Sequence, residues 1–406
     1  MEVVVGRACG LDVHKKNVVA AIRTPETRTT RTYGTYTREL RVMADWLASL
    51  GVTDVTMEGT GVYWRPVYNV LEEDGRFNLL VVNAQHVKKV PGRKTDVSDA
   101  EWLCDLLRHG LLHGSYVPSK EQRELRDLLR YRKSLVEERS REVNRVQKVL
   151  ETANIKLASV ATDVAGVSGR RIIAAMIEGI EDPEQLSGLA LGRLKEKEEQ
   201  LKESLVGIVG EHQRFLLREM LDRIEDLDKR IERLDAEVAR QTRPHEEQLA
   251  LLQTIPGVGP RTAELLIAEI GTDMTHFPTA GQLVSWAGFS PGSHASGGKR
   301  RNARTRKGSS WLRAGLVEAA WAAIRKRDTY FSAQYHRLAH RRGPKRAAFA
   351  VAHSILVVAY HVLLRGVPYK ELGPDFFDRQ NKEAVARRLA RRLEALGYEV
   401  MLRKPA

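Results

Sequence analysis

The sequence predicts an α/β domain followed by a longer, mainly α-helical part. Between residues 8 and 107, short β-branched or apolar runs alternate with helical patterns, which is typical of a mixed α/β sheet. From residue 121 the pattern changes to long helices without glycine. A chain of 406 residues with 42% hydrophobic content can form two or three domains, which excludes a disordered or fibrous protein.

The first predicted domain covers residues 1–118. Residues 8–23 read as two antiparallel strands around a polar turn, and a third strand follows closely. The remaining elements are helices and strands in alternation. In order, we expect the third strand over 29–37, a helix over 40–50, a strand over 54–57, a helix over 62–71, a strand over 79–82 and a helix over 102–107.

Residues 119–245 are expected to form a helical, coiled-coil region. Its first half has apolar residues at three- and four-residue steps, interrupted by Arg132 and Arg139. An intramolecular helix pair and a dimer seam fit this pattern equally well. Residues 153–192 are expected to be irregular and only loosely helical. The second half carries an unbroken heptad seam formed by Met220, Ile224, Leu227, Ile231, Leu234 and Val238.

Residues 246–375 predict a mainly helical domain that opens with a helix-hairpin-helix-like element, LLQTIPGVGPRTAELLIAEIG. Gly257 and Gly259 in its turn would let backbone N–H groups bind a phosphate at a helix N-terminus, although such a turn also connects packed helices. The apolar stretch 347–364 is shorter than the ~20 residues of a spanning helix and predicts a buried one. The sequence of residues 376–406 predicts a basic helical tail.

The charge balance favours a polyanionic partner, because Lys and Arg outnumber Asp and Glu 66 to 52. Cys9 and Cys104 are the two cysteines, and their spacing predicts neither a disulfide framework nor a zinc site. We therefore expect a reducing compartment. A secretory signal pattern is not recognisable, and no membrane partner is expected.

Four carboxylates occur where they can form one acidic site. Asp12 lies in the first predicted strand, Glu58 follows the fourth, and Asp96 and Asp99 lie in the KTDVSDA segment. In an RNase H-like fold the first and fourth strands are central neighbours, and the final helix packs across their carboxyl ends. Crowded carboxylates repel one another, and their oxygens suit Mg²⁺ or Mn²⁺. The order of the four acids therefore predicts a divalent-metal site for phosphodiester chemistry.

Each acid also has a structural interpretation. Asp12 can be a turn residue, Glu58 a solvated charge, and Asp96 and Asp99 helix caps. Their joint order favours the metal site. His14, two residues after Asp12, can be a ligand or a base, but such a histidine is more often exposed at a turn and is not included.

Residues 286–313 carry the strongest local signal for DNA handling. No acid occurs between Asp273 and Glu318, and a stretch with charges of one sign suits a DNA backbone. Glycines together with Trp286 and Trp311 indicate a folded segment rather than a solvated loop. The basic residues are Lys299, Arg300, Arg301, Arg304, Arg306, Lys307 and Arg313.

Ser296 is the candidate nucleophile of this segment. It precedes Gly297 and Gly298, where a tightly turned backbone would let the hydroxyl approach a phosphate. A serine hydroxyl is a weak nucleophile at neutral pH, so it needs a metal or a neighbouring base. Ser293 is the nearest alternative.

Taken together, the four acids, the IPGVGPRTA turn and the block AGFSPGSHASGGKRRNARTRKGSSWLR resemble the DEDD insertion-sequence transposases of the IS110 family. The resemblance covers about residues 8–375. It implies an RNase H-like (RuvC-like) N-terminal domain, a coiled-coil linker and a C-terminal transposase domain with the catalytic serine. It places the catalytic and metal-binding carboxylates on Asp12, Glu58, Asp96 and Asp99, and the serine on Ser296.

The resemblance also implies partners. Strand exchange would pass through a serine–DNA link at a composite site, in which the acidic domain of one subunit meets the serine domain of another. A structured bridge RNA would pair with donor and target DNA. We therefore expect Mg²⁺ or Mn²⁺, two DNA partners, a guide RNA, and a homodimer or homotetramer in the bacterial cytoplasm, associated with the nucleoid.

Two other functions fit parts of the sequence. A RuvC-like structure-specific nuclease would use the same acids to activate water, with Ser296 lining the DNA channel. A non-enzymatic nucleic-acid scaffold would use only the basic block and the turn, without metal dependence. The occurrence of all motifs in one order on one chain favours the transposase.

Overall fold

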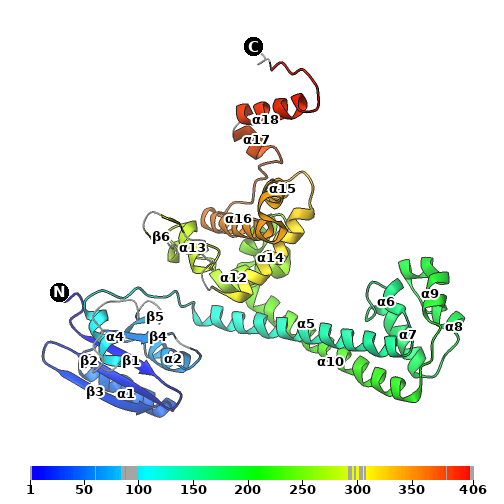
Figure 1. Ribbon diagram of the computed structural model, residues 1–406. Coiled ribbons are helices and arrows are strands. Elements are labelled where there is room, and N and C mark those ends of the chain that lie inside the picture. Colours follow the sequence, from blue (N-terminus) through cyan, green and yellow to red (C-terminus); the bar gives the residue numbers. More distant parts are fainter. Residues whose placement is uncertain are drawn as a thin grey trace. The chain divides into compact units, whose positions relative to one another are not determined.

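The computed structural model of the chain describes residues 2–59, 61–83, 87, 99–290, 295–296, 299–300, 305, 308–380 and 382–402; for 295–296 and 299–300 it describes the backbone alone. The chain forms two compact units, Met1–Pro118 and Ser119–Ala406 (Figure 1). The segments expected over 119–245, 246–375 and 376–406 all fall within the second unit.

The first unit is built on a five-stranded mixed sheet, which confirms the predicted α/β class. The strand order is β3-β2-β1-β4-β5, with β1, β2 and β3 antiparallel and β1, β4 and β5 parallel. The elements of this unit are β1 (Ala8–Val13), β2 (Asn17–Arg23), β3 (Arg28–Gly34), α1 (Thr37–Ser49), β4 (Asp54–Glu58), α2 (Trp64–Asp74), β5 (Asn78–Val82) and α4 (Asp99–Arg108).

The sheet separates two helical layers. Leu11 of β1 and Met57 of β4 lie opposite each other, and both pack into one core with α1 and α2. Side chains alternate between the faces of a sheet, so the neighbouring positions face the other layer. At Gly10, an added Cβ would lie 2.2 Å from the Ala100 carbonyl oxygen, which places α4 directly against β1 on that face. The central pairing of β1 with β4 was predicted and is confirmed.

Both cysteines of the chain are free and buried in this unit. Burial raises the pKa of the Cys104 thiol to about 12, so the thiol stays protonated at neutral pH.

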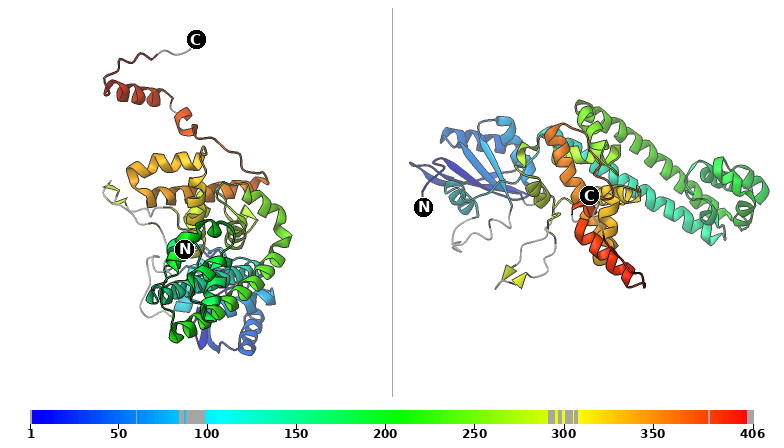
Figure 2. Two further views of the ribbon diagram at one scale, coloured as in Figure 1. Left: turned by 90° about the vertical axis from the view of Figure 1, so that its right-hand side faces the viewer. Right: turned by 90° about the horizontal axis from the view of Figure 1, so that it is seen from above.

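The second unit begins with a long helical hairpin, formed by α5 (Lys120–Thr152) and α10 (Glu211–Thr242), which lie side by side (Figures 1 and 2). Arg132 pairs with Asp235, and Arg139, seven residues further along α5, pairs with Asp228, seven residues back along α10. The helices are therefore antiparallel, and the heptad seam of α10 belongs to an intramolecular pair. Both arginines that interrupt the apolar pattern bind the partner helix.

Short helices between α5 and α10 pack with these two helices around one core, which includes Ile172 and Met176. The prediction of irregular structure over 153–192 was wrong in part, because α7 buries one apolar face but is too short to show a heptad pattern. These elements are α6 (Leu157–Val160), α7 (Val167–Ile177), α8 (Pro183–Gly188), η1 (Gly192–Lys197) and α9 (Glu198–Ser204).

The rest of the second unit is mostly helical. α16 is 22 residues long, longer than the predicted stretch, and is apolar enough by length and composition to cross a membrane. Half of its most apolar window is buried, and it packs on α13, α14 and α15, so it is the central helix of this part of the unit. The elements are η2 (Arg243–His245), α11 (Glu246–Gln253), α12 (Pro260–Ile270), η3 (Met274–His276), α13 (Ala280–Trp286), β6 (Ala295–Ser296), β7 (Lys299–Arg300), α14 (Ser310–Arg325), α15 (Tyr330–Arg342), α16 (Pro344–Arg365), α17 (Phe376–Gln380) and α18 (Lys382–Glu394).

Candidate active site and nucleic-acid interface

Asp12 and Glu58 lie at the carboxyl ends of two adjacent parallel strands. Each follows a residue of the register pair Leu11 and Met57, whose side chains belong to the core with α1 and α2. Because side chains alternate along a strand, Asp12 and Glu58 both face the opposite layer, which contains α4. The Asp12 side chain is 28% exposed, so it lies within reach of a ligand in solvent.

Asp99 is the first residue of α4, and the next residue, Ala100, lies against Gly10 of β1. The start of α4 therefore crosses β1 near the end that carries Asp12. Asp96 lies outside the described residues. Within the described part of the chain, no three His, Cys, Asp or Glu side chains are close enough together to hold a metal ion. That all four carboxylates form one site stays a prediction. Three of them, Asp12, Glu58 and Asp99, lie on one side of the sheet.

His14 is a candidate that the sequence interpretation left out. Its Nε2 lies 3.1 Å from Oδ2 of Asp12, while its ring stays half exposed. The two-residue spacing from Asp12 was the available signal, but spacing alone does not separate a partner of a carboxylate from an exposed turn histidine.

The candidate nucleophile lies in a small β-hairpin. Ser296 of β6 lies opposite Lys299 of β7, and Ala295 lies opposite Arg300. Both basic residues therefore belong to the strand that pairs with the strand of the serine. Ser293, Arg301, Arg304, Arg306 and Lys307 lie outside the described residues.

The two ends of the segment that carries this hairpin lie close together in the structure. Gly308 packs so closely on the end of α13 that an added Cβ would lie 2.2 Å from the Ala287 carbonyl oxygen. Phe289 stacks on Phe349 of α16, with ring centroids 4.8 Å apart. Ser309 caps α14 by accepting a hydrogen bond from the Leu312 N–H. We call residues 289–309 the serine loop, and its base is fixed to three helices.

Arg313, which was predicted to bind nucleic acid, makes two internal contacts in the structure. Its Nη2 donates to the Gly288 carbonyl oxygen at 2.9 Å, and its guanidinium lies over the Phe349 ring. Arg313 therefore joins the base of the serine loop to α14.

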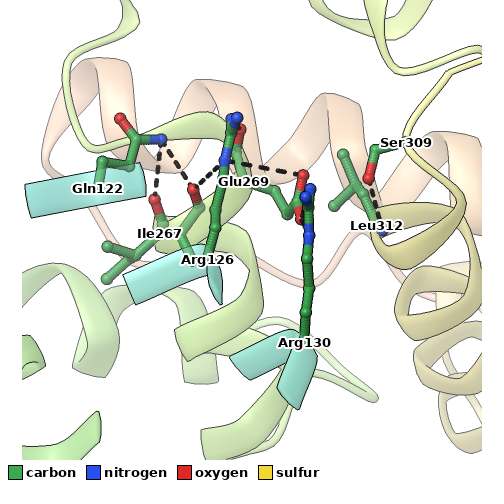
Figure 3. Close-up of polar contacts among 8 residues, drawn as sticks. Gln122, Arg126, Arg130, Ile267, Glu269, Ser309 and Leu312 are labelled. Carbon is green, nitrogen blue, oxygen red and sulfur yellow. Dashed lines mark hydrogen bonds and ion pairs between the residues drawn. The ribbon is translucent and has the colours of Figure 1, made fainter. Parts of the chain in front are cut away.

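A polar network joins α5 to the C-terminal end of α12 (Figure 3). Gln122 and Arg126, one turn apart on α5, both donate to the Ala268 carbonyl oxygen, at 2.9 and 2.7 Å. One turn further, Arg130 donates to Oε1 of Glu269 at 2.8 Å. These donors satisfy carbonyl groups that the end of a helix leaves unpaired.

The same arginines contact the base of the serine loop. Arg126 lies over the ring of Trp286, the last residue of α13, and Arg130 lies over the ring of Trp311 in the first turn of α14. The Glu269 side chain is only 2% exposed, so its charge depends on these two guanidinium groups. We call Arg126, Arg130 and Glu269 the α5–α12 clamp.

The helix-hairpin-helix-like turn is present between α11 and α12. Gly257 has a φ of +85°, and an added Cβ would lie 2.2 Å from the Ala319 carbonyl oxygen of α14, so this glycine serves packing. Gly259 caps α12 and has open space around it. Of the two glycines, Gly259 is therefore the one whose surroundings suit a phosphate at a helix N-terminus.

Comparison with known proteins defines the class of protein: the chain matches transposases. A transposase model of the DEDD IS110 type matches residues 9–155, which include the strands with Asp12 and Glu58. A second model, described as "Transposase IS116/IS110/IS902 family", matches residues 249–336, which include the serine loop.

Individual relatives have the same class. The chain is 27% identical over 334 residues to a "Probable family 20 transposase" of Pseudomonas aeruginosa, covering 80% of this chain and 88% of the relative. It is 26% identical over 348 residues to the "Transposase for insertion sequence element IS1111A" of Coxiella burnetii, covering 82% and 85%. The chain belongs to the IS110 family of insertion-sequence transposases, and it is an enzyme of DNA transposition.

Proposed function

We propose that this transposase cuts and rejoins DNA through a covalent link between Ser296 and DNA, at a site where Asp12, Glu58, Asp96 and Asp99 hold Mg²⁺ or Mn²⁺. The observation that carries the proposal is the placement of Asp12 and Glu58. They lie on adjacent parallel strands and face the layer of α4, the helix that begins at Asp99. We further propose an RNase H-like fold for the first unit.

The chemistry of the donor set suits a hard divalent cation. Carboxylate oxygens come from neighbouring strand ends and from the start of α4, and oxygen ligands are those that Mg²⁺ prefers. Such an ion, when bound, would lower the negative charge of a DNA phosphate and favour its attack. His14, through its contact with Oδ2 of Asp12, holds this carboxylate in one orientation.

The serine step conserves the energy of the DNA backbone. The Ser296 oxygen attacks a backbone phosphorus; an O–P bond to serine forms as one P–O bond of the DNA breaks. The serine proton passes to a carboxylate or water, and the released strand oxygen takes up a proton. A free strand end can later attack the serine ester and restore a phosphodiester. A water attack would instead discard the ester, which is the outcome for a nuclease.

The polyanionic partners are donor and target DNA and a structured bridge RNA. We assign the phosphates beside the attacked one to Lys299 and Arg300, because their strand pairs with the strand of Ser296. Arg301, Arg304, Arg306 and Lys307 continue the same positive run in the sequence. The open N-terminus of α12 at Gly259 offers a further phosphate contact.

A denaturing gel with labelled DNA that carries an end of the insertion element tests this proposal. We expect a protein–DNA adduct that requires Mg²⁺, is lost after RNase treatment of the protein, persists in Ser293→Ala and is absent in Ser296→Ala. Cleavage without any adduct would support a RuvC-like nuclease instead. An adduct that depends on Ser293 would overturn the assignment of the nucleophile.

A further inference from the structure

A cavity of about 440 Å³ lies where α15 meets the C-terminal helices α17 and α18. Two residue pairs, each one helical turn apart on α15, line it: His336 with His340, and Arg337 with Arg341. Arg388 of α18 adds a third guanidinium from a separate helix. Basic side chains from two elements therefore converge on one hollow, which we call the α15–α18 cavity.

Among the residues that the structure describes, the three arginines of the cavity have no acidic partner. In the part of the chain that the structure describes, no carboxylate lies within 4.0 Å of Arg337, Arg341 or Arg388. Arginines elsewhere in this unit, such as Arg139, have such partners. Asp378 is the acid in the cavity wall, so with neutral histidines the lining carries three positive charges against one negative charge.

The surrounding sequence does not supply the missing counter-charge. From residue 329 to residue 370 the chain contains no Asp or Glu. The same segment contains seven basic residues, namely Arg337, Arg341, Arg342, Lys345, Arg346, Arg365 and Lys370. Like charges that share a hollow repel one another, so a bound anion would stabilise this arrangement.

One guanidinium of the cavity has a fixed orientation. Arg337 lies over the ring of Phe377, 5.2 Å from the ring centroid. Tyr330 also stacks on the Phe377 ring, with ring centroids 5.1 Å apart. Because a guanidinium that rests on an aromatic ring keeps its N–H groups free at the edge, Arg337 can still donate to a ligand.

We propose that the α15–α18 cavity binds the phosphodiester backbone of nucleic acid. Planar guanidinium groups donate paired hydrogen bonds that match phosphate oxygens, and a polyanion can engage three arginines at once. The volume is within the range of small-molecule sites, so it admits about a nucleotide of chain. Apart from Ala333 and His336, the lining lies beyond the matched residues 249–336. The site acts independently of Ser296 and of any metal.

The test is fluorescence anisotropy with the full-length, RNase-treated protein and two labelled probes, a short mixed-sequence DNA duplex and a single-stranded RNA. The cavity variant carries Arg337→Gln, Arg341→Gln and Arg388→Gln. We expect it to bind at least one probe about tenfold more weakly, and the log-log salt slope to fall by about 0.9 per lost duplex contact or 0.7 per lost single-strand contact. The probe that is affected identifies the source of the phosphate.

The matched control carries Arg193→Gln, Arg233→Gln and Arg243→Gln. These arginines are exposed, lie outside the cavity and remove the same three charges. The proposal requires the control to bind like the parent protein and the cavity variant to keep the parent's thermal melting curve. Equal affinity and salt slope in both variants would overturn it. So would a cavity-dependent affinity for polyglutamate without one for nucleic acid. Ser296→Ala is measured in parallel and should bind normally, whether or not the serine is the nucleophile.

Discussion

Gly10 leaves no room for a side chain between β1 and α4. In Gly10→Ala the new methyl carbon would meet the Ala100 carbonyl oxygen at 2.2 Å and the Cys104 nitrogen at 2.5 Å, both backbone atoms that cannot rotate away. We expect a loss of about 1–3 kcal/mol in the free energy of unfolding, as in overpacked cores. Because α4 begins at Asp99, we also expect strand transfer to fall.

Gly6→Ala is the matched control, because an added Cβ there meets nothing within 4 Å. Urea unfolding and the adduct gel compare the two variants. If Gly10→Ala is as stable and as active as Gly6→Ala, then α4 does not need its close contact with β1, and the placement of Asp99 beside Asp12 loses its support.

Residue roles were predictable from sequence where the cause is local. The orientation of Asp12 and Glu58 follows from strand alternation, and the cap formed by Ser309 follows from its place before a helix. The roles of Gly257 and Arg313 were not predictable, because their contacts are with Ala319 of α14 and with Phe349 of α16, far away in sequence. A glycine that permits close packing and a glycine that binds phosphate look the same in one sequence.

At the scale of elements, the α5–α12 clamp makes a stability prediction. Glu269→Ala would leave Arg126 and Arg130, with side chains 13% and 25% exposed, without their buried counter-charge. We expect a loss of about 3 kcal/mol in the free energy of unfolding, since breaking a buried ion pair leaves an uncompensated charge. Because both arginines contact tryptophans at the base of the serine loop, we also expect altered tryptophan fluorescence and a weaker adduct.

Glu237→Ala serves as the control for this change, because Glu237 pairs with Arg240 on the exposed surface of α10. An exposed pair of this kind contributes little, so the melting temperature and the fluorescence should stay close to those of the parent protein. A Glu269→Ala protein that melts like the Glu237→Ala protein would show that the clamp does not hold the loop base.

The hydrophobic period of the sequence predicted whether a segment forms a helix or a strand, but it did not predict which element packs against which. Strands such as β4 and long helices such as α10 match the sequence pattern closely. A heptad seam looks the same whether the second helix belongs to the same chain or to another, so the pairings of Arg132 with Asp235 and of Arg139 with Asp228 were needed to decide between them. Short helices such as α7 lack a long enough period to be recognised.

For the whole molecule, the proposed acids and the proposed serine lie in different compact units. If the acids of one subunit serve the serine of another, a mixed dimer of Asp12→Asn and Ser296→Ala chains contains one site with both intact groups. We expect each variant alone to be inactive and the mixture to recover part of the strand transfer. The readout is joined DNA on a denaturing gel.

Exchange of subunits must be allowed before this assay, for example by mixing the two chains during refolding or by expressing them together. A mixture in which heterodimers form and no activity returns would contradict the composite site and would place the acids and the serine of one active site in the same subunit.

The closed base of the serine loop has an evolutionary consequence. Because Gly308 packs on Ala287, the two ends of the loop lie in contact. The packing of the helices at its base therefore does not depend on the length of the loop. Residues added to the loop or removed from it would change the closure entropy only slightly, by about 0.6 kcal/mol for each doubling in length. The serine and its basic neighbours can therefore diverge rapidly, or be exchanged as a cassette between related transposases, while the helical scaffold stays the same.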